Sequence, residues 1–407
     1  MLHGPCHAAT LIPDGRPRKS SLRHMPENTV GARDTRCGRC QSRCDEYRRD
    51  RPGGRLAAPA SAPMPHQRED IELALPEQLK HLRIPLIGSP LFIISNPELV
   101  LAQCKAGIVG SFPALNAREK EGEEIELDKW LTRITEELDA HNQANPDTPA
   151  APYAVNQIVH KSNARLERDV EICVKHKVPV WITSLGAQPW VYEAAHSVGA
   201  IVLHDIINDM FARKAIDKGA DGLIAVAAGA GGHAGALSPM ALIQEIREWF
   251  DGPVYLSGAI AKGDSILASQ AMGADGGYAG SIFIATEEAN AQPGYKEMIT
   301  QNGASDIVYS NLFTGVWGNY LKPSVAAAGM DPDALERSDP SAMNFASAGE
   351  SKAKKWKDIW GSGQGIGVVR DIRPTAQVVD QLAREYEAAQ HRLADTLGWP
   401  GLAKAAE

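Results

Sequence analysis

A glycine-rich stretch with one histidine, residues 227–235, carries the clearest chemical pattern in this sequence of 407 residues. It reads AAGAGGHAG and follows an apolar run, 221–228, whose length and branching are typical of a buried strand. Ser238 and Pro239 then favour the start of a helix, as N-cap and first helical residue. Parallel α/β folds bind ligands at such strand ends, and glycines let a flat ligand approach the backbone. A tight turn with a surface histidine has the same pattern, so both interpretations stay open.

His233 is the residue of this stretch that we expect to react. An unperturbed histidine titrates near neutral pH, so it can act as a general base at physiological pH. It can also donate a hydrogen bond to a bound anion. His204 is less distinctive. Asp205 beside it could orient a histidine or bind a ligand hydroxyl, although capping the next helix is the commoner role.

Composition and charge exclude several classes of function. Hydrophobic residues make up 43% of the chain and charged residues 23%, which are ordinary values for a globular protein. Residues 1–63 are basic, with 12 Lys and Arg against 6 Asp and Glu, whereas the rest of the chain is acidic. An acidic body without a basic stripe argues against nucleic acid as a partner. We expect no membrane association, because no apolar run could cross a bilayer and no signal peptide is present.

The six cysteines fit a reducing compartment better than a disulfide framework, so we expect a cytoplasmic protein. Cys104 and Cys173 lie in apolar helical patterns and are predicted to be buried thiols. The three cysteines at 37, 40 and 44 resemble half of a zinc site, but a complete site needs four ligands. We therefore predict no metal.

Residues 1–66 differ from the rest of the chain. They are rich in Arg, Pro, Gly and Ser and lack helical or strand periodicity. We predict a disordered leader here, consistent with an upstream-extended start and Met64 as the alternative beginning.

From residue 84 the chain repeats one pattern eight times, an apolar strand followed by a helical stretch. Gly107, Gly199, Gly219 and Gly273 follow helices and precede strands, as C-caps do. Eight such units over about two hundred residues predict a closed (β/α)₈ TIM barrel spanning residues 80–291. An open doubly wound sheet is less favoured, because no G-x-G-x-x-G follows the first strand. The predicted strands and helices are 84–91 and 97–106, 107–112 and 127–141, 153–159 and 163–176, 178–184 and 189–198, 200–205 and 210–218, 223–227 and 239–250, 253–258 and 264–272, and 276–281 and 286–291.

The repeat is lost in residues 292–407. Residues 306–321 and 342–367 mix Gly, Trp and Asn with short apolar pieces, and the pattern of 374–397 predicts one amphipathic helix. We expect a C-terminal extension that packs over the barrel mouth as a lid or against the barrel's side.

Polar or glycine residues end most of the predicted strands, and a barrel gathers such ends at one mouth. Gly258 and Gly280 follow strands seven and eight, where barrels commonly bind phosphate through backbone N–H groups. These glycines leave room for phosphate oxygens, and the Ser281 hydroxyl can donate to them. Ordinary strand-end turns are the alternative. The full set of strand ends is Ser89–Pro90, Asn156–Gln157, Ser184, His204–Asp205, Gly231–His233, Ser257–Gly258 and Gly280–Ser281.

These motifs make the chain similar to the nitronate monooxygenases, formerly called 2-nitropropane dioxygenases, which are FMN-dependent (β/α)₈ enzymes. The resemblance covers residues 80–390, and its most specific part is 230–235, AGGHAG, which resembles the family's A-G-G-H-x-G. Residues 253–286 resemble the family next most closely. Supporting matches are 107–111, 155–156, 219–221, 273–276, 280–281 and 363–365.

The resemblance implies FMN as cofactor and the oxidation of a nitronate or nitroalkane with O₂ to a carbonyl compound and nitrite. His233 matches the histidine that takes a proton beside the nitro group. A homodimer is compatible with the Ala- and Gly-rich barrel. The implied cofactor-binding residues are Pro90, Leu91, Asn156, His204, Asp205, Gly231, Gly232, Gly258, Ala259, Gly280 and Ser281, with Gly363 and Gln364 toward the substrate.

Three positions depart from the family pattern. Gly229 stands where a Glu is frequent, Asp205 where many members have a Lys near the flavin, and Ala259 where a second Gly is usual. Without that lysine, an anionic reduced flavin would be stabilised less well. Three other functions therefore stay open: an NAD(P)H-dependent flavin enoyl-thioester reductase, a flavin-free phosphosugar barrel, and a non-catalytic flavin-binding module.

Overall fold

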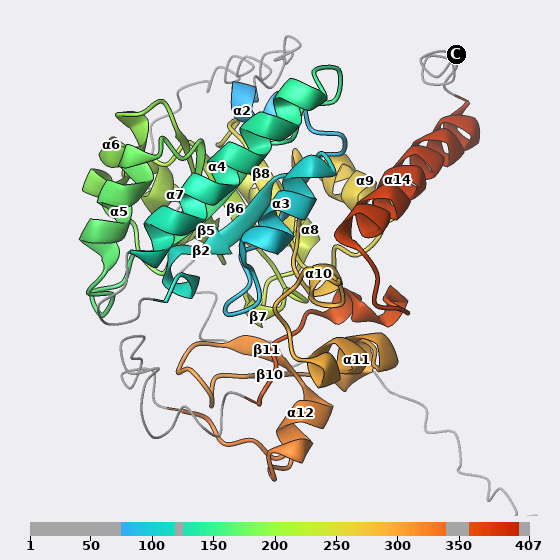
Figure 1. Ribbon diagram of the computed structural model, residues 1–407. Helices are drawn as coiled ribbons and strands as arrows, with labels where there is room; N and C mark the ends of the chain where they lie inside the picture. Colours follow the sequence, from blue (N-terminus) through green and yellow to red (C-terminus); the bar gives the residue numbers. More distant parts are fainter. Residues whose placement is uncertain (1–74, 119–124, 339–357, 399–407) are drawn as a thin grey trace, which may run out of the picture. The chain divides into compact units, whose positions relative to one another are not determined.

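Eight parallel strands close into a barrel in the computed structural model, which describes residues 75–118, 125–338 and 358–398 (Figure 1). The strand order is β1-β9-β8-β6-β5-β4-β3-β2, and a bridge between Ile87 and Val109 joins the first strand to the last. The predicted TIM barrel is therefore confirmed. The strands are β1 (Leu86–Gly88), β2 (Gly110–Pro113), β3 (Tyr153–Ile158), β4 (Val180–Ser184), β5 (Ile201–Ile206), β6 (Gly222–Val226), β8 (Val254–Ser257) and β9 (Gly276–Ala279).

Helices cover the outside of the barrel. Asn96 and Asn208 cap two of them, because their side-chain oxygens accept from the backbone N–H groups of Leu99 and Phe211. The four glycines predicted as C-caps all have positive φ. The helices are α3 (Pro97–Lys105), α4 (Glu126–Ala144), α5 (Leu166–Lys175), α6 (Pro189–His196), α7 (Asp209–Asp217), α8 (Pro239–Arg247) and α9 (Gly263–Ala271).

The prediction of a helix over 286–291 is wrong. The strand β9 leads instead into a four-residue helix, α10 (Ser281–Ile284), and the long helix α14 (Thr375–Leu397) packs against α9 and α3. The loop after α10 is tied to the start of α14, because Glu288 accepts hydrogen bonds from the backbone N–H and the hydroxyl of Thr375. The eighth outer helix is thus supplied by a distant segment of the chain.

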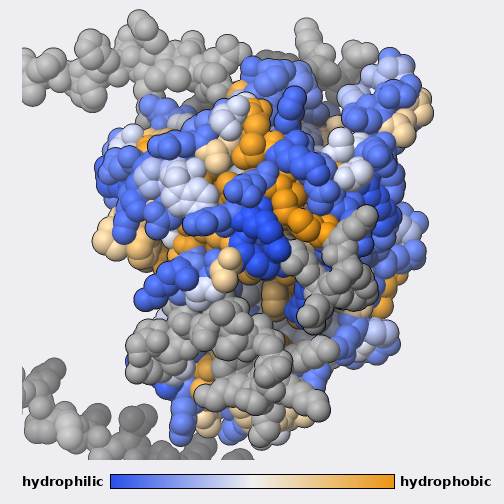
Figure 2. Space-filling view, turned by 60° about the vertical axis from the view of Figure 1, so that its left-hand side comes forward, coloured by the Kyte–Doolittle hydropathy of each residue, from blue (hydrophilic) through white to orange (hydrophobic). Residues whose placement is uncertain are grey.

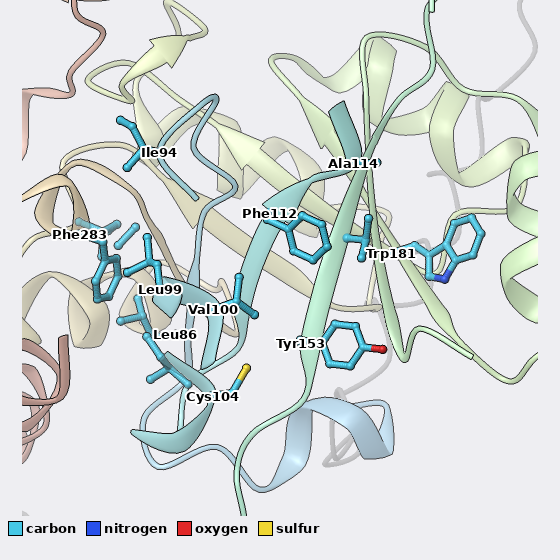
Figure 3. Close-up of a cluster of buried hydrophobic side chains, with 14 of the residues drawn as sticks. Leu86, Ile94, Leu99, Val100, Cys104, Phe112, Ala114, Tyr153, Trp181 and Phe283 are labelled. Atoms are coloured by element: carbon cyan, nitrogen blue, oxygen red, sulfur yellow. The ribbon is translucent and has the colours of Figure 1, made fainter. Parts of the chain in front are cut away.

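Two apolar layers hold the barrel together. The inner layer fills the barrel with side chains such as Ile182, Leu203 and Tyr255, and Leu79 of α2 (Glu77–Lys80) packs against it at the end where the strands begin. The outer layer lies between strands and helices; Figure 3 shows part of it, including Phe112, Trp181 and Leu99. Cys104 and Cys173 are buried free thiols, as predicted.

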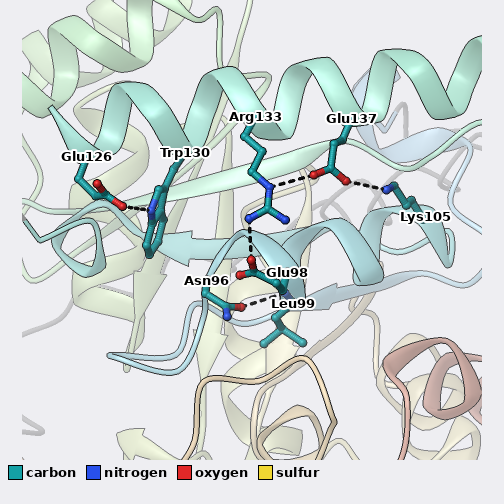
Figure 4. A network of polar contacts seen from close by, with 8 residues as sticks. All are labelled: Asn96, Glu98, Leu99, Lys105, Glu126, Trp130, Arg133 and Glu137. Atoms are coloured by element: carbon teal, nitrogen blue, oxygen red, sulfur yellow. Dashed lines mark hydrogen bonds and ion pairs between the residues drawn. The ribbon is translucent and has the colours of Figure 1, made fainter. Parts of the chain in front are cut away.

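Ion pairs fasten α4 to α3 on the surface (Figure 4). Arg133 contacts Glu98 at 2.6 Å and Glu137 at 2.9 Å, and Glu137 also contacts Lys105 at 3.1 Å. Exposed pairs of this kind each contribute about 0–1 kcal/mol, so the buried layers carry most of the stability. Within the described ranges, no helix combines the length and the apolar character needed to cross a membrane.

A small antiparallel sheet adjoins the barrel mouth and carries the predicted reactive histidine. Its strands are ordered β10-β11-β7, and β7 is the short strand Gly232–His233. Phe313, Tyr320 and Val325 form its own apolar core. We call this sheet, together with the helices that accompany it in the chain, the cap. Besides β7, its elements are β10 (Ile307–Ser310), β11 (Gly318–Leu321), α11 (Pro293–Gln301), α12 (Lys322–Ala327) and the 3₁₀ helices Ala304–Asp306 and Gln364–Val368. The predicted leader, the cysteines at 37, 40 and 44, and Met64 lie outside the described residues.

Candidate active site at the barrel mouth

The cap sheet fixes the position of His233. Pairing of β7 with β11 places His233 opposite Gly318, and the imidazole Nε2 lies 3.2 Å from the Thr314 hydroxyl oxygen. The Asn319 side chain donates to the Ala230 carbonyl at 2.7 Å, which holds the preceding turn against the same strand. The glycine turn is therefore anchored by the cap.

Burial lowers the pKa of His233 to about 4. Removing the ring from water disfavours its charged form, so the neutral imidazole is favoured. At neutral pH the side chain is therefore an uncharged imidazole with one nitrogen lone pair, the form that can accept a proton.

Backbone N–H groups at two neighbouring strand ends form a set of unused donors. After β8, the N–H groups of Gly258, Ala259 and Ile260 make no hydrogen bond to any part of the chain that the structure describes. After β9, the same holds for the N–H groups of residues 280–282. Gly258 and Ala259 have positive φ angles (141° and 57°), which turn the backbone of 258–260 out of the direction of strand β8. Clustered backbone donors of this kind suit an anion such as phosphate.

Residues 362–365 fasten this set to the histidine turn. The Gly363 N–H donates to the Ser281 hydroxyl oxygen at 2.8 Å, and the Gln364 N–H donates to the Gly229 carbonyl at 2.9 Å. A Cβ on Gly231 would lie 2.6 Å from the Gly363 nitrogen, so only glycine permits this approach. Gly363 and Gln364, predicted to lie toward the substrate, thus contact Ser281 and Gly229.

The loop after β1 completes the mouth beside Gly280. A Cβ on Gly280 would lie 2.4 Å from the Ser89 hydroxyl oxygen and 3.0 Å from a methyl group of Leu91. The backbone of Leu91 is held on both sides, by Ser95 at 2.9 Å and by Asn116 at 2.9 Å. Leu91, one of the predicted cofactor-binding residues, thus lies next to Gly280, and Pro90 precedes it in the same loop.

A chain of polar side chains crosses the ends of β3, β4 and β5. The Asn156 amide donates to the Ser184 hydroxyl at 2.8 Å, and this hydroxyl donates to one Asp205 oxygen at 2.6 Å. The other Asp205 oxygen is buried and has no partner among the described residues. Burial raises the pKa of Asp205 to about 7, although the Ser184 hydrogen bond opposes this shift. Burial raises the pKa of Tyr278 well above its usual value, and the nearby Asp205 carboxylate raises it further.

The raised pKa makes folding stability depend on pH through Asp205. Its folded pKa of about 7 exceeds the ordinary value of 3.8 for an aspartic acid, so its stability contribution is lost as pH rises between these values. Asp205→Asn should therefore unfold at a temperature at least about 2 °C higher than the parent protein at pH 8, and closer to the parent at pH 5. Thermal unfolding of the flavin-free protein at both pH values measures this. Ser184→Ala should steepen the parent's pH dependence, and a constant Asp205→Asn difference would contradict the assignment.

His204 does not join this group. Its Nδ1 lies 2.7 Å from the Thr183 hydroxyl and 3.0 Å from the Tyr192 hydroxyl of α6, on the outer face of the sheet. Successive strand residues point to opposite faces, so Asp205 can face the barrel only if His204 faces the helices. His204 therefore has no part in the proposed site.

Two contributors to the site were not predicted. Thr314 comes from a cap loop without periodicity, and no spacing relates it to His233. Tyr278 belongs to an apolar strand pattern, which predicts burial but not proximity to Asp205. Within the described ranges, no cluster of His, Cys, Asp or Glu could hold a metal ion.

Comparison with known proteins identifies the family. A family model described as nitronate monooxygenase matches residues 77–385. A relative from Mycobacterium tuberculosis, named as a monooxygenase, is 28% identical over 230 residues, which span 53% of this chain and 61% of that protein, less than two thirds of its length. A nitronate monooxygenase of Neurospora crassa is 26% identical over 344 residues, which span 74% of this chain and 88% of that protein.

A solved structure supports the fold. Nitroalkane oxidase from Streptomyces ansochromogenes aligns with a TM-score of 0.63 at 21% identity, covering 77% of this chain and 98% of the other. The family match extends over the barrel, the histidine turn and much of the cap. The chain therefore belongs to the nitronate monooxygenase family and is an oxidoreductase.

Proposed function

We propose that this protein is an FMN-dependent nitronate monooxygenase that converts nitronates and nitroalkanes, with O₂, into carbonyl compounds and nitrite. The observation that carries the proposal is the joining of two features at one mouth. Unused backbone donors follow β8 and β9, and residues 362–365 connect them to the turn that holds His233. An anion site beside a neutral histidine suits a phosphorylated cofactor and proton abstraction.

The residues present fit FMN. The N–H groups of 258–260 and 280–282, with the Ser281 hydroxyl, would hold the phosphate. The glycines 231–232 offer a surface without side chains for a flat ring, and the Leu91 side chain offers an apolar one. The unpartnered oxygen of Asp205 supplies a polar contact for a donor group of the cofactor. When bound, FMN supplies the two-electron oxidation of the nitronate and the return of those electrons to O₂.

His233 performs the step that distinguishes the two substrates. A neutral nitroalkane must lose a proton from the carbon beside its nitro group, and the imidazole accepts it. Thr314, at 3.2 Å, orients the ring. A preformed nitronate has already lost this proton, so it needs His233 only for contact. Family membership supports the reaction class, and the position and the protonation state of His233 support its role as the base.

Anaerobic mixing of the purified protein with propyl nitronate tests the proposal. The flavin absorbance bands should bleach on mixing and return when air is admitted. If only NAD(P)H bleaches the flavin, the protein is a reductase, and enoyl thioesters become the substrates to examine. A flavin that neither compound bleaches would indicate a non-catalytic binding module. A colourless protein that takes up no added FMN would contradict the flavin site itself.

A further inference from the structure

Asp205 places a carboxyl group inside the barrel. Acidic side chains are seldom buried without a charged partner, and the outer face in Figure 2 is accordingly mostly hydrophilic. Asp205 instead follows Leu203 on the inner face of β5, and its register partner on β6 is Ile224. Both of these neighbours belong to the inner apolar layer. The carboxyl group therefore lies where that apolar layer ends and the barrel mouth begins.

The two oxygens of Asp205 have different surroundings. One accepts a hydrogen bond from the Ser184 hydroxyl at 2.6 Å. The other is buried and has no partner among the described residues. A buried carboxylate oxygen without a hydrogen-bond donor is costly, and a proton on that oxygen removes the charge. This oxygen is therefore a place where the protein can hold a proton.

The groups that face Asp205 bring no positive charge to it. Ser184 and Asn156, on β4 and β3, are uncharged, and Tyr278 on β9 has a pKa well above its usual value. His204, the neighbour of Asp205 in the strand, points to the outer face. Burial and the Ser184 hydrogen bond account for the pKa of Asp205 of about 7, with no contribution from a charged group in the part of the chain that the structure describes. A modest change in local charge can therefore decide whether Asp205 is ionised at neutral pH.

We propose that Asp205 takes up a proton when the bound cofactor is reduced and releases it when the cofactor is reoxidised. The inference rests on the proposed function, which places FMN at this mouth. Reduction by two electrons from the nitronate adds negative charge there, and a like charge within about 4–6 Å favours the protonated form of a carboxyl group. Because Asp205 is one of the three departures from the family pattern, this proton uptake would be particular to this chain.

The protons and electrons of this step balance. For each pair of electrons taken from the nitronate, two protons enter from solvent, one to the cofactor and one to form an O–H bond on Asp205. Both protons leave when the electron pair passes to O₂. Asp205→Asn, which has no carboxyl group to protonate, should take up only the proton that binds to the cofactor.

The pH dependence of the cofactor's reduction potential tests the inference. Each proton taken up per two electrons lowers the potential by about 30 mV per pH unit. Between about pH 7.5 and pH 9, above the pKa of Asp205, reductive titration of the FMN-bound protein with dithionite should give a slope of about 60 mV per pH unit for the parent and about 30 mV for Asp205→Asn. Asp217→Asn is the matched control, because it removes the same charge from an exposed position at the end of α7, and it should keep the parent's slope.

Two further readouts separate a proton on Asp205 from a structural effect of the substitution. The Ser184 hydrogen bond lowers the pKa of Asp205, so Ser184→Ala should move the start of the steep slope to higher pH. Infrared difference spectra of the reduced and oxidised protein at about pH 8.5 report the carboxyl group directly. A band of a protonated carboxyl group should appear on reduction of the parent and be missing from Asp205→Asn.

The outcomes distinguish this inference from the proposed function. Equal slopes in the parent and Asp205→Asn, with no carboxyl band, would overturn the inference, while bleaching by propyl nitronate would leave the proposed function intact. If dithionite bleaches the flavin but propyl nitronate does not, the proposed function fails, and the slopes still decide whether Asp205 takes the proton. A protein that binds no FMN would contradict both.

Discussion

Replacing His233 by Asn should lower kcat/KM for neutral nitroalkanes by about 10²- to 10⁴-fold, the usual contribution of a positioned general base. Asn is close in size and can still bond to Thr314, which lies 3.2 Å from the imidazole. Its amide cannot take a proton at neutral pH. Preformed nitronates should retain most of their turnover, because they do not need this proton transfer. Steady-state kinetics with nitroethane and ethyl nitronate measure both effects.

The pH profile provides a second readout for the same residue. Because burial lowers the pKa of His233 to about 4, the ring stays neutral from pH 8 to pH 6. Nitroalkane turnover should therefore show no loss from His233 over that range and should decline only as pH falls toward 4. Flavin content of His233→Asn should equal that of the parent. Equal losses with nitroalkane and nitronate would show that His233 is not the base.

Gly258→Ala should weaken FMN binding by about 10- to 100-fold. Its φ of 141° is a conformation that side chains rarely adopt, and a Cβ would lie 2.8 Å from the Ala228 carbonyl oxygen. Escape from such strain, about 1–3 kcal/mol, requires the turn to move and takes the N–H groups of 258–260 out of place. Fluorescence titration of the flavin-free protein with FMN measures the affinity.

Two substitutions serve as controls for Gly258→Ala. Ala259→Gly should keep FMN affinity, because Ala259 already has a φ of 57°, which glycine adopts without strain. Gly294→Ala, in α11, meets only ordinary contact with Trp360 at 3.5 Å and should affect neither binding nor stability. Full FMN affinity in Gly258→Ala would remove this turn from the phosphate site.

Local patterns predicted the barrel and most of the mouth. The alternation of apolar strands and amphipathic helices was sufficient to order all eight strands, because each βα unit carries its own periodicity and glycine cap. Many of the residues at the barrel mouth could then be predicted from the same strands, because the carboxyl ends of the strands in such a barrel meet on one side. This reasoning brought Gly231, Gly258 and Ser281 to one place without any knowledge of contacts.

Features that depend on distant contacts were not predictable. The two residues of β7 are too few to show a period, and only their pairing with β11 makes them a strand. The helix expected at 286–291 failed because its place is taken by residues 375–397, which the sequence separates from β9 by the whole cap. His204 and Asp205 were proposed together, although neighbours in a strand cannot both face the barrel.

The late position of α14 in the chain affects the order in which the protein can assemble on the ribosome. Helix α14 packs on α9 and α3, and Arg83 near the first strand pairs with Asp380 at 2.5 Å. Nearly three hundred residues must be synthesised between these two partners. Nascent chains that already contain all eight strands still expose the apolar surface that α14 covers, around Gly263, until translation passes residue 397. This surface is therefore exposed to non-native contacts during synthesis, and the exposure arises from the order of the elements in the chain rather than from its composition.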